Sequence, residues 1–520
     1  MNEIGWPTID SEHLIVDSKQ MLQLENEIFS EGMPQEALME KAGIQLSRWF
    51  LKRKSLLKDG VTVAIGPGNN GGDGAVIARE LFLKGYSVKV WCPFPIKKTL
   101  TINHLNYLTS IGVQKLIVPP HTKGKDLWID AVFGVNQNRK VNDELIQLFN
   151  RKIINNLGKV IAIDIPTGLC PNKGKPFLKE AVKADYTLVI GLTKIGLIQD
   201  SALPFIGELN LIDIGIPKNK LSKVENKILK ISYKDIKNIY LPFLPKNTNK
   251  YSRGRTLIIA GSDKYSGAAY LALKGAISSG VGFVSAILPD LVAKSIWKFA
   301  PEVVVKGIME CDQNGNAALL KALSNIDLKS YDSIIIGPGI GIDFDDWQKS
   351  NNYLLNFKGL LILDADALNR ISQSSIGSKF FLERKYQTWI TPHISEFKRL
   401  FPDIKGENGI QLAMNAAKEF NISVLLKGAN SIIANNKRAW QIFGTDAETA
   451  RAGLGDLLSG FVAGSSAMEI ASSGKITTEL FSKYVLLHSF AASKCKRGSN
   501  ASEISIELAR LTRKKTREML

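Results

Sequence analysis

The chain has 520 residues, more than the roughly 250 to 300 that one hydrophobic core usually supports, so we expect two domains. Its composition, 45% hydrophobic and 22% charged, is ordinary for a globular protein and excludes wholesale disorder. The formal net charge of +18 is mostly lysine spread along the chain, without a zinc finger, an RRM signature or interleaved aromatic and basic residues, so we expect no nucleic-acid partner. We interpret the dense basic patches at 217–230 and at the C-terminus as a solvated linker and tail.

Signals for targeting and for an oxidising compartment are missing from the sequence. The N-terminal residues show no basic region followed by an apolar core, so we expect no secretory signal. No uninterrupted apolar run reaches the roughly 18 residues of a membrane helix, so we expect no membrane partner. Cys92, Cys170, Cys311 and Cys495 are scattered and form no CxxC pair, which argues against a zinc ribbon or a disulfide framework. These features favour a cytoplasmic protein.

Short β-branched runs alternate with longer amphipathic segments, a pattern typical of parallel sheets covered by helices. In the first half this pattern predicts strands at 61–65, 87–92, 115–118, 127–133, 159–165, 186–190 and 207–214. In the second half it predicts strands at 256–260, 283–288, 333–337, 360–365, 388–391 and 423–427. A hairpin at 431–443 and helices from about 453 to the end follow. We expect the two α/β domains to divide within the basic stretch 218–235.

A glycine-rich stretch, PGNNGGDG at 67–74, follows the predicted strand VTVAI at 61–65. Ligands of open parallel sheets bind beyond the carboxyl ends of the strands, where helix N-termini present N–H groups to anions. Glycines let backbone amides approach a phosphate, while Asn69, Asn70 and Asp73 offer side chains to a hydroxyl or a cation. The stretch is neither a Walker loop nor a GxGxxG motif, and its alternative is a tight turn with positive φ. We favour the ligand site, because a turn needs only one or two glycines.

Two further segments place an acid at the end of an apolar strand, DAVFG at 130–134 and DIPTGL at 164–169. A carboxylate in such a position is costly unless it has a partner, such as a metal ion or a substrate hydroxyl. Each acid alone is equally well explained as a helix N-cap. Because the carboxyl ends of parallel strands meet at one edge of a sheet, we expect the three segments to form one crevice.

The first half resembles the NAD(P)H-hydrate epimerase family over roughly residues 15–220, through LMEKAG at 38–43, NNGGDG, DAVFG and DIPTGL in that order. The resemblance implies a Rossmann-like three-layer αβα domain at 1–225, which interconverts the R and S epimers of NADH or NADPH hydrated at C6 of the nicotinamide ring. It implies a potassium ion held by Asn70, Asp130 and Thr167, and Asp164 as the catalytic residue that transfers a proton. The residues implied to contact the hydrate are Asn69, Asn70, Gly71, Gly72, Asp73, Gly134, Val135, Asn136, Gln137, Asn138, Arg139, Lys140 and Asp164.

Two positions depart from the family's usual pattern. CPNKG at 170–174 stands where the family usually follows its DIPSGL segment with Asp-Thr-Gly, and Glu25 stands where the family often has Asp. Both lie at the edge of the implied site, and the residues at its centre are intact.

The second half contains GLGDLLSG at 453–460, followed by an apolar run. A GxGD at a helix start provides an anion hole of backbone N–H groups and one carboxylate, Asp456, that can take a proton from a hydroxyl. GxGD alone is nearly as well explained by a glycine-bracketed helix entry with an acidic first turn. Five other strand ends supply the context: GSDKYSGAA at 261–269, GPGIG at 337–341, DADAL at 364–368, TPHISEF at 391–397 and LKGAN at 426–430.

Together these segments resemble the ADP-dependent NAD(P)H-hydrate dehydratase family, a branch of the ribokinase-like α/β fold, over roughly residues 240–505. The resemblance implies a domain at 235–520 in which Asp456 is catalytic. His393 taken alone is more often a hydrogen-bonded turn residue, and Arg451 replaces a small residue that usually precedes the GxGD motif. The residues implied to contact the hydrate are Ala268, Gly339, His393 and Asp456, and those implied to bind the nucleotide are Lys427, Gly428, Ala429, Asn430, Ser431 and Gly455.

The two resemblances together imply a repair reaction on hydrated NADH and NADPH. The first domain would interconvert the epimers, and the second would dehydrate the S form at the expense of ADP, giving AMP and phosphate. Potassium in the first domain, Mg²⁺ with ADP in the second, and a homo-oligomer are expected. Two alternatives stay open: a small-molecule kinase of the ribokinase type, since phosphoryl transfer is shared, and a first domain that only binds a nucleotide or a partner.

Overall fold

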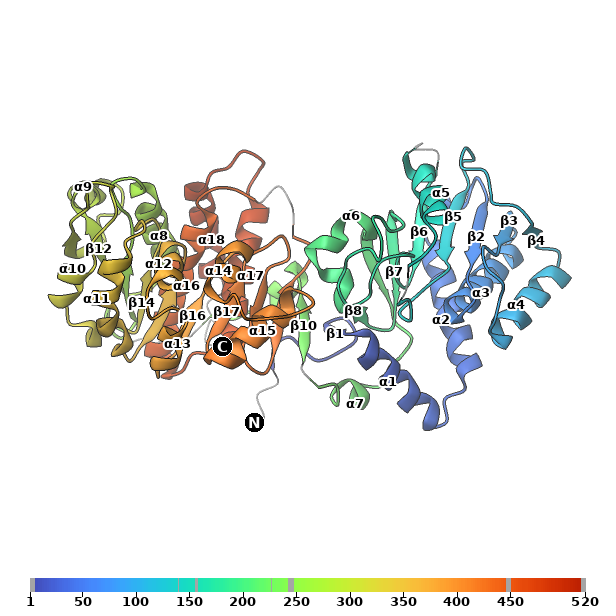
Figure 1. Cartoon of the computed structure of the whole chain (residues 1–520), viewed down its shortest axis with the longest axis horizontal. Coiled ribbons are helices and arrows are strands. Elements are labelled where there is room, and N and C mark those ends of the chain that lie inside the picture. The colour runs from blue at the N-terminus through green and yellow to red at the C-terminus, as the bar shows by residue number, and fades with distance from the viewer. Residues whose placement is uncertain are drawn as a thin grey trace. The chain divides into compact units, whose positions relative to one another are not determined.

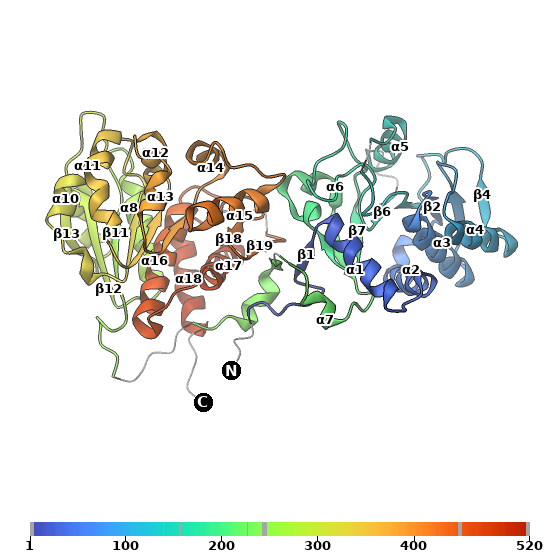
Figure 2. The same ribbon diagram turned by 60° about the horizontal axis from the view of Figure 1, so that its bottom comes forward.

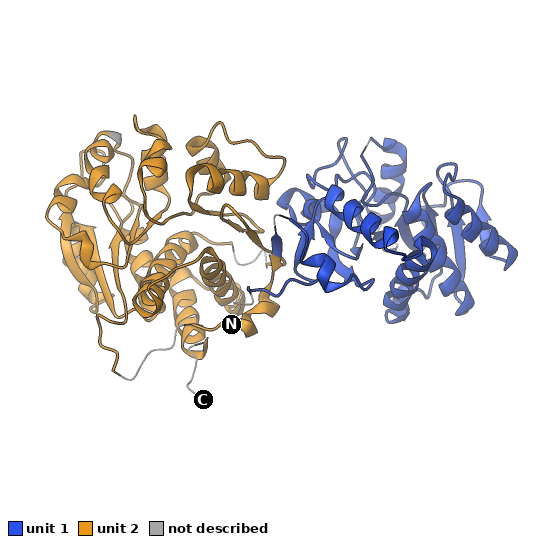
Figure 3. Cartoon of the chain, turned by 90° about the horizontal axis from the view of Figure 1, so that it is seen from below, with its two compact units in different colours: residues 1–229 blue, residues 230–520 orange. Residues whose placement is uncertain are grey.

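The computed structural model describes residues 5–138, 140–154, 158–225, 227–241, 247–445 and 450–515. The chain forms two compact units, residues 1–229 and 230–520 (Figure 3). Figure 1 labels the elements along the chain. The boundaries that we expect for the two catalytic domains, at residues 225 and 235, stay a prediction.

The first unit is built on a seven-stranded sheet in which every neighbouring pair is parallel. The chain runs from β2 outward to β3 and β4, and then returns to β5 on the other side of β2. This reversal creates a crevice between the carboxyl ends of β2 and β5, the usual ligand position in such sheets. All seven predicted strands of this half are present, in the spatial order β4 (Gln114–Leu116), β3 (Val88–Trp91), β2 (Val61–Ile65), β5 (Leu127–Ala131), β6 (Val160–Ile163), β7 (Tyr186–Ile190) and β9 (Glu208–Ile212).

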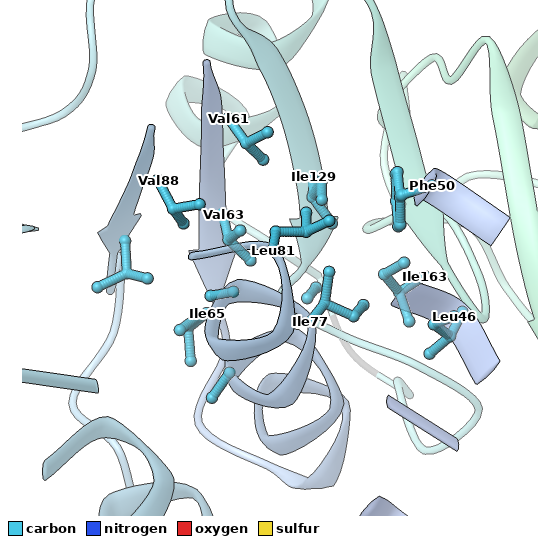
Figure 4. Packing of buried hydrophobic residues seen from close by; sticks show 14 of the residues in the cluster. Leu46, Phe50, Val61, Val63, Ile65, Ile77, Leu81, Val88, Ile129 and Ile163 are labelled. Carbon is cyan, nitrogen blue, oxygen red and sulfur yellow. The ribbon is translucent and has the colours of Figure 1, made fainter. Parts of the chain in front are cut away.

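Helices cover both faces of this sheet, which gives three layers. On one face, α2 (Gln35–Leu51), α3 (Asn69–Leu83) and α4 (Thr99–Ser110) share a buried apolar cluster with the strands. Figure 4 shows Ile77 and Leu81 of α3 among the strand residues of this cluster. On the other face, α5 (Asp143–Ile154) packs Phe149 against Trp128 of β5. The three-layer α/β prediction for this half is confirmed.

The remaining elements of the first unit surround the sheet. A short strand pair that the sequence did not predict joins β1 (Leu14–Val16) to β8 (Thr193–Lys194) in parallel, and β1 also pairs with β10 (Ile228–Ile231) in antiparallel fashion. The other elements of the unit are α1 (Ser18–Ser30), η1 (Lys54–Leu56), η2 (Ile195–Ile198), η3 (Asp200–Ala202), α6 (Leu203–Ile206) and α7 (Lys218–Leu221).

The basic stretch 217–230 is only partly the solvated linker that its charge suggested. It contains α7 and the start of β10, and the side chain of Lys220 is buried against α1. There Lys220 forms ion pairs with Glu27 and Glu31. The acids that neutralise this lysine lie almost 200 residues earlier in the chain, so charge density along the sequence could not show that Lys220 is buried.

The second unit contains a mainly parallel sheet that ends in an antiparallel hairpin. The predicted strands and the hairpin are present. The sequence did not predict the edge strand β13, because its side chains alternate between partly buried and exposed and include a lysine and a glycine. In spatial order the strands are β13 (Val304–Met309), β12 (Phe283–Pro289), β11 (Arg255–Ile259), β14 (Ser333–Ile336), β15 (Leu360–Leu363), β16 (Thr388–Ile390), β17 (Ser423–Leu426), β18 (Ile432–Ala434) and β19 (Ala439–Ile442).

Helices again cover this sheet, and α8 and α16 lie beside β11 (Figure 2). As predicted, helices dominate the described residues from 453 onward. In chain order the helices are η4 (Tyr233–Asn238), α8 (Ser266–Ser278), α9 (Asp290–Ser295), η5 (Ile296–Lys298), α10 (Leu320–Ser324), η6 (Leu328–Ser330), α11 (Phe344–Leu355), α12 (Asp366–Gln373), α13 (Lys379–Glu383), α14 (Ile394–Leu400), α15 (Gly409–Phe420), α16 (Leu454–Ser473), α17 (Thr478–Lys494) and α18 (Ala501–Lys515).

Helices α8 and α16 approach each other closely because glycines lie where they cross. A Cβ atom at Gly460 of α16 would stand 1.8 Å from the carbonyl oxygen of Ala272, and one at Gly275 of α8 would stand 2.0 Å from that of Leu457. No side chain fits at either position without moving a helix. This contact fixes the start of α16, where the GxGD motif lies.

No helix among the described residues has both the length and the low polarity that a membrane crossing requires. The four cysteines carry free thiols.

We predict that Gly460→Ala lowers the free energy of unfolding of the second unit by about 1 to 3 kcal/mol, because the added methyl group overpacks the α8–α16 contact. The control is Gly267→Ala at the start of α8, where an added Cβ meets no atom within 4 Å. Helix propensity should make that variant more stable by up to about 1 kcal/mol. Chemical denaturation of both variants measures the difference, and equal stabilisation by both would contradict the close contact.

Two candidate active sites

In the first unit the glycine-rich stretch lies where the chain leaves β2. Helix α3 begins at Asn69, and its N-cap residue, Gly68, makes no side-chain capping bond, so the first turn presents backbone N–H groups. The loop after β5 reaches the same crevice through Gly134, where an added Cβ would lie 3.0 Å from Asp164 Oδ2 and 3.3 Å from Asn70 Oδ1. Three segments that the sequence placed at strand ends therefore meet, as predicted.

Asp164 is held in a conformation that few residues other than glycine adopt. Its φ is +66°, and its carboxylate is buried at the end of β6. Oδ1 lies 2.5 Å from the ammonium group of Lys194, and Oδ2 accepts the backbone N–H of Val135 at 2.9 Å. The N–H of Ile190 donates to Oδ1 at 3.3 Å. These donors fix the orientation of the carboxylate, an arrangement suited to a residue that must face a substrate in one pose.

The carboxylate faces a cleft of about 380 Å³, which Glu25, Asp73 and Lys194 also line. Burial, opposed by the charge of Lys194, raises the pKa of Glu25 to about 6. Burial and the carboxylates of Asp164 and Glu25 raise the pKa of Asp73 well above its usual value. Lys194 thus faces three acids and cannot neutralise all of them. Glu25 and Asp73 therefore keep their protons to a higher pH than an exposed carboxyl group would.

Beside this cleft, Asp130 and Thr167 form a tight pair beneath the loop. Thr167 donates its hydroxyl to Asp130 Oδ1 at 2.7 Å and its N–H to Oδ2 at 2.8 Å. Burial raises the pKa of Asp130 to about 6, although the bonds from Thr167 and Val132 oppose the shift. Asn70, next to Gly134 of the same loop, has both amide atoms buried and without a hydrogen-bond partner among the described residues. A buried amide oxygen without a donor is suited to a cation.

The structure brings most of the predicted hydrate contacts of this half to the cleft. Gly71 and Gly72 are an exception, since they face the protein. A Cβ at Gly71 would lie 2.1 Å from the carbonyl oxygen of Gly66, and one at Gly72 would lie 2.5 Å from Met39 Sδ, so both are required for packing. Asn138 and Lys140 line a neighbouring hollow, and Arg139 lies outside the described residues. The predicted residues that line the cleft are Asn69, Asn70, Asp73, Gly134, Val135, Asn136, Gln137 and Asp164.

Sequence reasoning missed Lys194 and placed Glu25 only at the edge of the site. Lys194 belongs to the two-residue strand β8 and is 1% exposed, yet in the sequence it is one of many lysines. Glu25 was noted as a departure from a family pattern, and the structure places it in the cleft on helix α1. The second departure, CPNKG, supports this helix, because Asn172 Oδ1 accepts the backbone N–H of Ser18 at its start.

In the second unit the corresponding reversal of chain direction lies between β11 and β14. The loops after these strands are joined by a hydrogen bond from the N–H of Gly261 to the carbonyl of Pro338 at 2.7 Å. A Cβ at Gly339 would lie 2.7 Å from the Cβ of Ala268. The two residues predicted from separate motifs to contact the hydrate are therefore neighbours.

Asp456 lies in the first turn of α16, beside an ion pair formed by two other strand ends. Lys427, after β17, donates to Asp364 Oδ1, after β15, at 2.8 Å. A Cβ at Gly455 would lie 3.8 Å from Lys427 Nζ, which places the ammonium group next to the GxGD backbone. Burial and then the carboxylate of Asp364 raise the pKa of Asp456 to about 7, although Lys427 opposes the shift. Asp456 therefore exchanges its proton near neutral pH.

Arg370 holds the glycine-rich loop after β14 in place. Its guanidinium group is fully buried, donates to the carbonyls of Gly341, Ala317 and Ile340 at 2.8 to 2.9 Å, and pairs with Asp346 at 3.1 Å. A buried arginine that donates hydrogen bonds to several backbone carbonyls in this way fixes the geometry of the backbone around it. This role could not be predicted from the sequence, because the carbonyls that Arg370 contacts lie 29 to 53 residues earlier in the chain.

His393 caps helix α14, in agreement with the alternative interpretation of this residue. Its Nδ1 accepts the N–H groups of Ser395 and Glu396, and its Nε2 lies 3.3 Å from Glu396 Oε1. The ring is half exposed, so a cap and a ligand contact are compatible. Residues 427–431 form a turn between β17 and β18, in which the Ser431 hydroxyl donates to the carbonyl of Gly428. Arg451 donates to the carbonyl of Lys496 at 3.4 Å.

Comparisons with known proteins cover both units. Residues 35–196 match the family described as YjeF-related protein N-terminus, and residues 256–505 match the family described as NAD(P)H-hydrate dehydratase. A ribokinase-like superfamily protein from Enterococcus faecalis is similar in structure, with a TM-score of 0.46, 23% identity, and coverage of 56% of this chain and 96% of that one. The ADP/ATP-dependent NAD(P)H-hydrate dehydratase of Bacillus subtilis, co-crystallised with ATP and Mg²⁺, has a TM-score of 0.45 and 23% identity over 54% of this chain and 96% of that chain.

Full-length relatives match across both units at once. The bifunctional NAD(P)H-hydrate repair enzyme of Synechocystis sp. is 37% identical over 456 residues, which cover 86% of this chain and 85% of the relative. That of Gloeobacter violaceus is 36% identical over 467 residues, which cover 86% and 88%. Together with the two family matches, this identifies the chain as a member of the bifunctional NAD(P)H-hydrate repair enzyme family.

Proposed function

We propose that this chain repairs hydrated NADH and NADPH in two reactions, one in each unit. The first unit epimerises the hydrate at C6, and the second dehydrates the S epimer with ADP as the co-substrate. The observation that carries the proposal is that an oriented acid lies at the ligand edge of each sheet, in a chain that matches a bifunctional family over both units. The reactants are small molecules in the cytoplasm, and we expect the chain to act as a homo-oligomer.

Epimerisation inverts the carbon that bears the hydroxyl group and the ring nitrogen. This requires either exchange of a proton or opening and closing of the ring, and both routes need a positioned acid or base. Asp164 supplies it. Its carboxylate faces the cleft, and Lys194 and the N–H of Val135 fix the two oxygens. Lys194 is the positioning residue that sequence reasoning missed.

A potassium ion fits the donor set beside this cleft. Asn70 offers a buried amide oxygen without a donor, Asp130 offers one carboxylate, and Thr167 offers a hydroxyl oxygen. Among the described residues, no cluster of three or more His, Cys, Asp or Glu side chains could hold a metal ion, so a weakly hydrated monovalent cation suits the set better than zinc. The ion would neutralise negative charge that develops on the substrate's oxygen.

For dehydration, Asp456 takes the proton of the C6 hydroxyl, which then attacks the terminal phosphate of ADP. AMP leaves, the phosphorylated hydroxyl departs as phosphate with electrons from the ring nitrogen, and loss of a proton from C5 to water or to the departing phosphate then restores the dihydronicotinamide ring. Lys427 and the N–H groups at the start of α16 face the place where the phosphate charge develops. We expect Mg²⁺ to be bound mainly by oxygens of the nucleotide's phosphates.

Asp456→Asn should lower the dehydration rate by about 10² to 10⁴-fold, because the base is lost and the backbone anion hole is kept. In the unmodified protein the rate should rise with pH through about 7, since the carboxyl group must lose its proton before it can act. Single-turnover rates between pH 5.5 and 8.5 measure both effects. Nucleotide binding and epimerisation serve as controls that should be unchanged, and near-normal dehydration by the variant would remove Asp456 from the mechanism.

Asp164→Asn should change the time course of repair. With excess ADP and a mixture of both epimers, the unmodified protein should consume all of the hydrate in one phase. The variant should consume the S fraction quickly and leave R to decay at its spontaneous rate, because only the second unit stays active. Chromatography of both epimers follows the reaction. Complete single-phase consumption by the variant would favour a first unit that only binds a ligand or partner.

Potassium should stabilise the first unit through Asn70. We expect KCl to raise the melting temperature of the protein relative to tetramethylammonium chloride at equal ionic strength, and to support epimerisation. Asn70→Ala should abolish both effects. Thermal melting with each salt makes the comparison, with Asn106→Ala, an exposed asparagine of the same unit, as the matched control. A potassium effect that persists in Asn70→Ala would place the ion elsewhere.

A further inference from the structure

Next to the catalytic cleft lies a second hollow, of about 300 Å³, which we call the mouth pocket. It is lined by Phe94, Lys97 and Lys140 together with Pro67, Phe133 and Gln137. Pro67, Lys97, Phe133 and Gln137 also line the catalytic cleft, so the two hollows are continuous. The proposed epimerisation uses only the nicotinamide end of the substrate, and it leaves the mouth pocket without a role.

The two hollows differ in their acids. The catalytic cleft is lined by the acids Glu25, Asp73 and Asp164 and by the lysines Lys97, Lys98 and Lys194, whereas none of the described residues that line the mouth pocket is acidic. The side chains of Lys97 and Lys140 are exposed there, and within the described part of the chain neither forms an ion pair with a carboxylate. The ring end of a dinucleotide therefore suits the cleft, which holds the carboxylates, and its anionic remainder suits the mouth pocket, where the lining cations face no lining carboxylate.

Aromatic rings give the mouth pocket a surface for a base. Phe94 and Phe133 lie with their ring centroids 5.5 Å apart, and both pack on the apolar layer beneath them. The loop that carries Phe94 and Lys97 is tied to the glycine-rich stretch, since the N–H groups of Lys97 and Lys98 donate to the carbonyl of Pro67 at 3.2 and 3.3 Å. The pocket is thus built onto the same loop as the catalytic cleft and keeps a fixed position beside it.

Each part of a dinucleotide beyond its nicotinamide ring can be assigned to one of these features. Its pyrophosphate suits the start of α3, where the N-cap residue leaves N–H groups open next to Lys98. Its adenine then reaches the aromatic surface. Sites for NAD commonly present an acid to the ribose 2′-hydroxyl, whereas sites for NADP present a cation to the 2′-phosphate. The mouth pocket has cations and no acid.

We propose that the mouth pocket binds the adenosine half of the substrate, with the base against Phe94 and Phe133 and the 2′-phosphate against Lys97 and Lys140, so that the first unit prefers NADPH hydrate to NADH hydrate. The inference rests on the proposed epimerisation. It assigns a specificity role to Lys97, which lines both hollows, and a shared binding role to Phe94.

The test is epimerisation by the full chain without ADP, in which loss of excess R or S epimer is followed for each hydrate separately. Lys97→Ala with Lys140→Ala should raise KM for NADPH hydrate by about three- to tenfold with kcat unchanged, and leave KM for NADH hydrate unchanged, as expected for exposed charge pairs. Phe94→Leu should raise KM for both hydrates about equally, since adenine is common to both. Lys123→Ala, an exposed lysine that lines neither hollow, is the matched control.

A second measurement separates this inference from the proposed function. Calorimetric titration with adenosine 2′,5′-bisphosphate should show weaker binding in the lysine variant than in the Lys123→Ala control, whether or not epimerisation occurs. If the unmodified protein does not epimerise either hydrate but the titration shows this difference, the proposed function fails and the pocket stands. Equal effects of the lysine changes on both hydrates would assign them to the pyrophosphate and overturn the preference, and no effect on KM or on the titration would overturn the pocket.

Discussion

A carboxylate buried at the end of a parallel strand needs a cation, and in both units one lysine supplies it. Lys194 pairs with Asp164 in the first unit, and Lys427 pairs with Asp364 in the second. Each lysine stands close to more acids than it can neutralise. Burial therefore raises the pKa of Glu25 to about 6 and that of Asp456 to about 7, and the nearby lysine only partly opposes each shift. The chemistry that we assign to each unit depends on this imbalance, because it leaves an acid that exchanges its proton near neutral pH.

The sheets place these groups together. In both units the chain runs outward from a central strand and then returns on its other side, which opens a crevice at β2–β5 and at β11–β14. Glycines then allow the close approaches that the crevice requires: Gly134 lies against Asp164, and Gly460 lets α16 approach α8. The ion pairs, the helix starts and the glycine contacts therefore support one another, and a change in any of them alters the position of the acids.

The sequence predicted what depends on local pattern. Apolar runs predicted the strands of both sheets except β13 and the short strands β1, β8 and β10. Glycine-rich strand ends correctly placed Asn70 and Gly339 in the crevices. The sequence could not predict Lys194, because a buried lysine has no local signature and its partner lies 30 residues earlier. For the same reason the sequence did not predict that Lys220, within the basic stretch, is buried, because its acidic partners Glu27 and Glu31 come from α1 and its end. Pairings between distant charges are set by tertiary packing, which local periodicity does not record.

The central claim is that one chain carries both reactions, and a single incubation tests it most directly. Purified protein is mixed with unequal amounts of R and S NADPH hydrate, with and without ADP, and both epimers, NADPH, AMP and phosphate are followed by chromatography. Our account predicts that the epimers equilibrate without ADP, and that with ADP both disappear while NADPH, AMP and phosphate appear in equal amounts. A stable phosphorylated product, or an R epimer that persists in the presence of ADP, would contradict it.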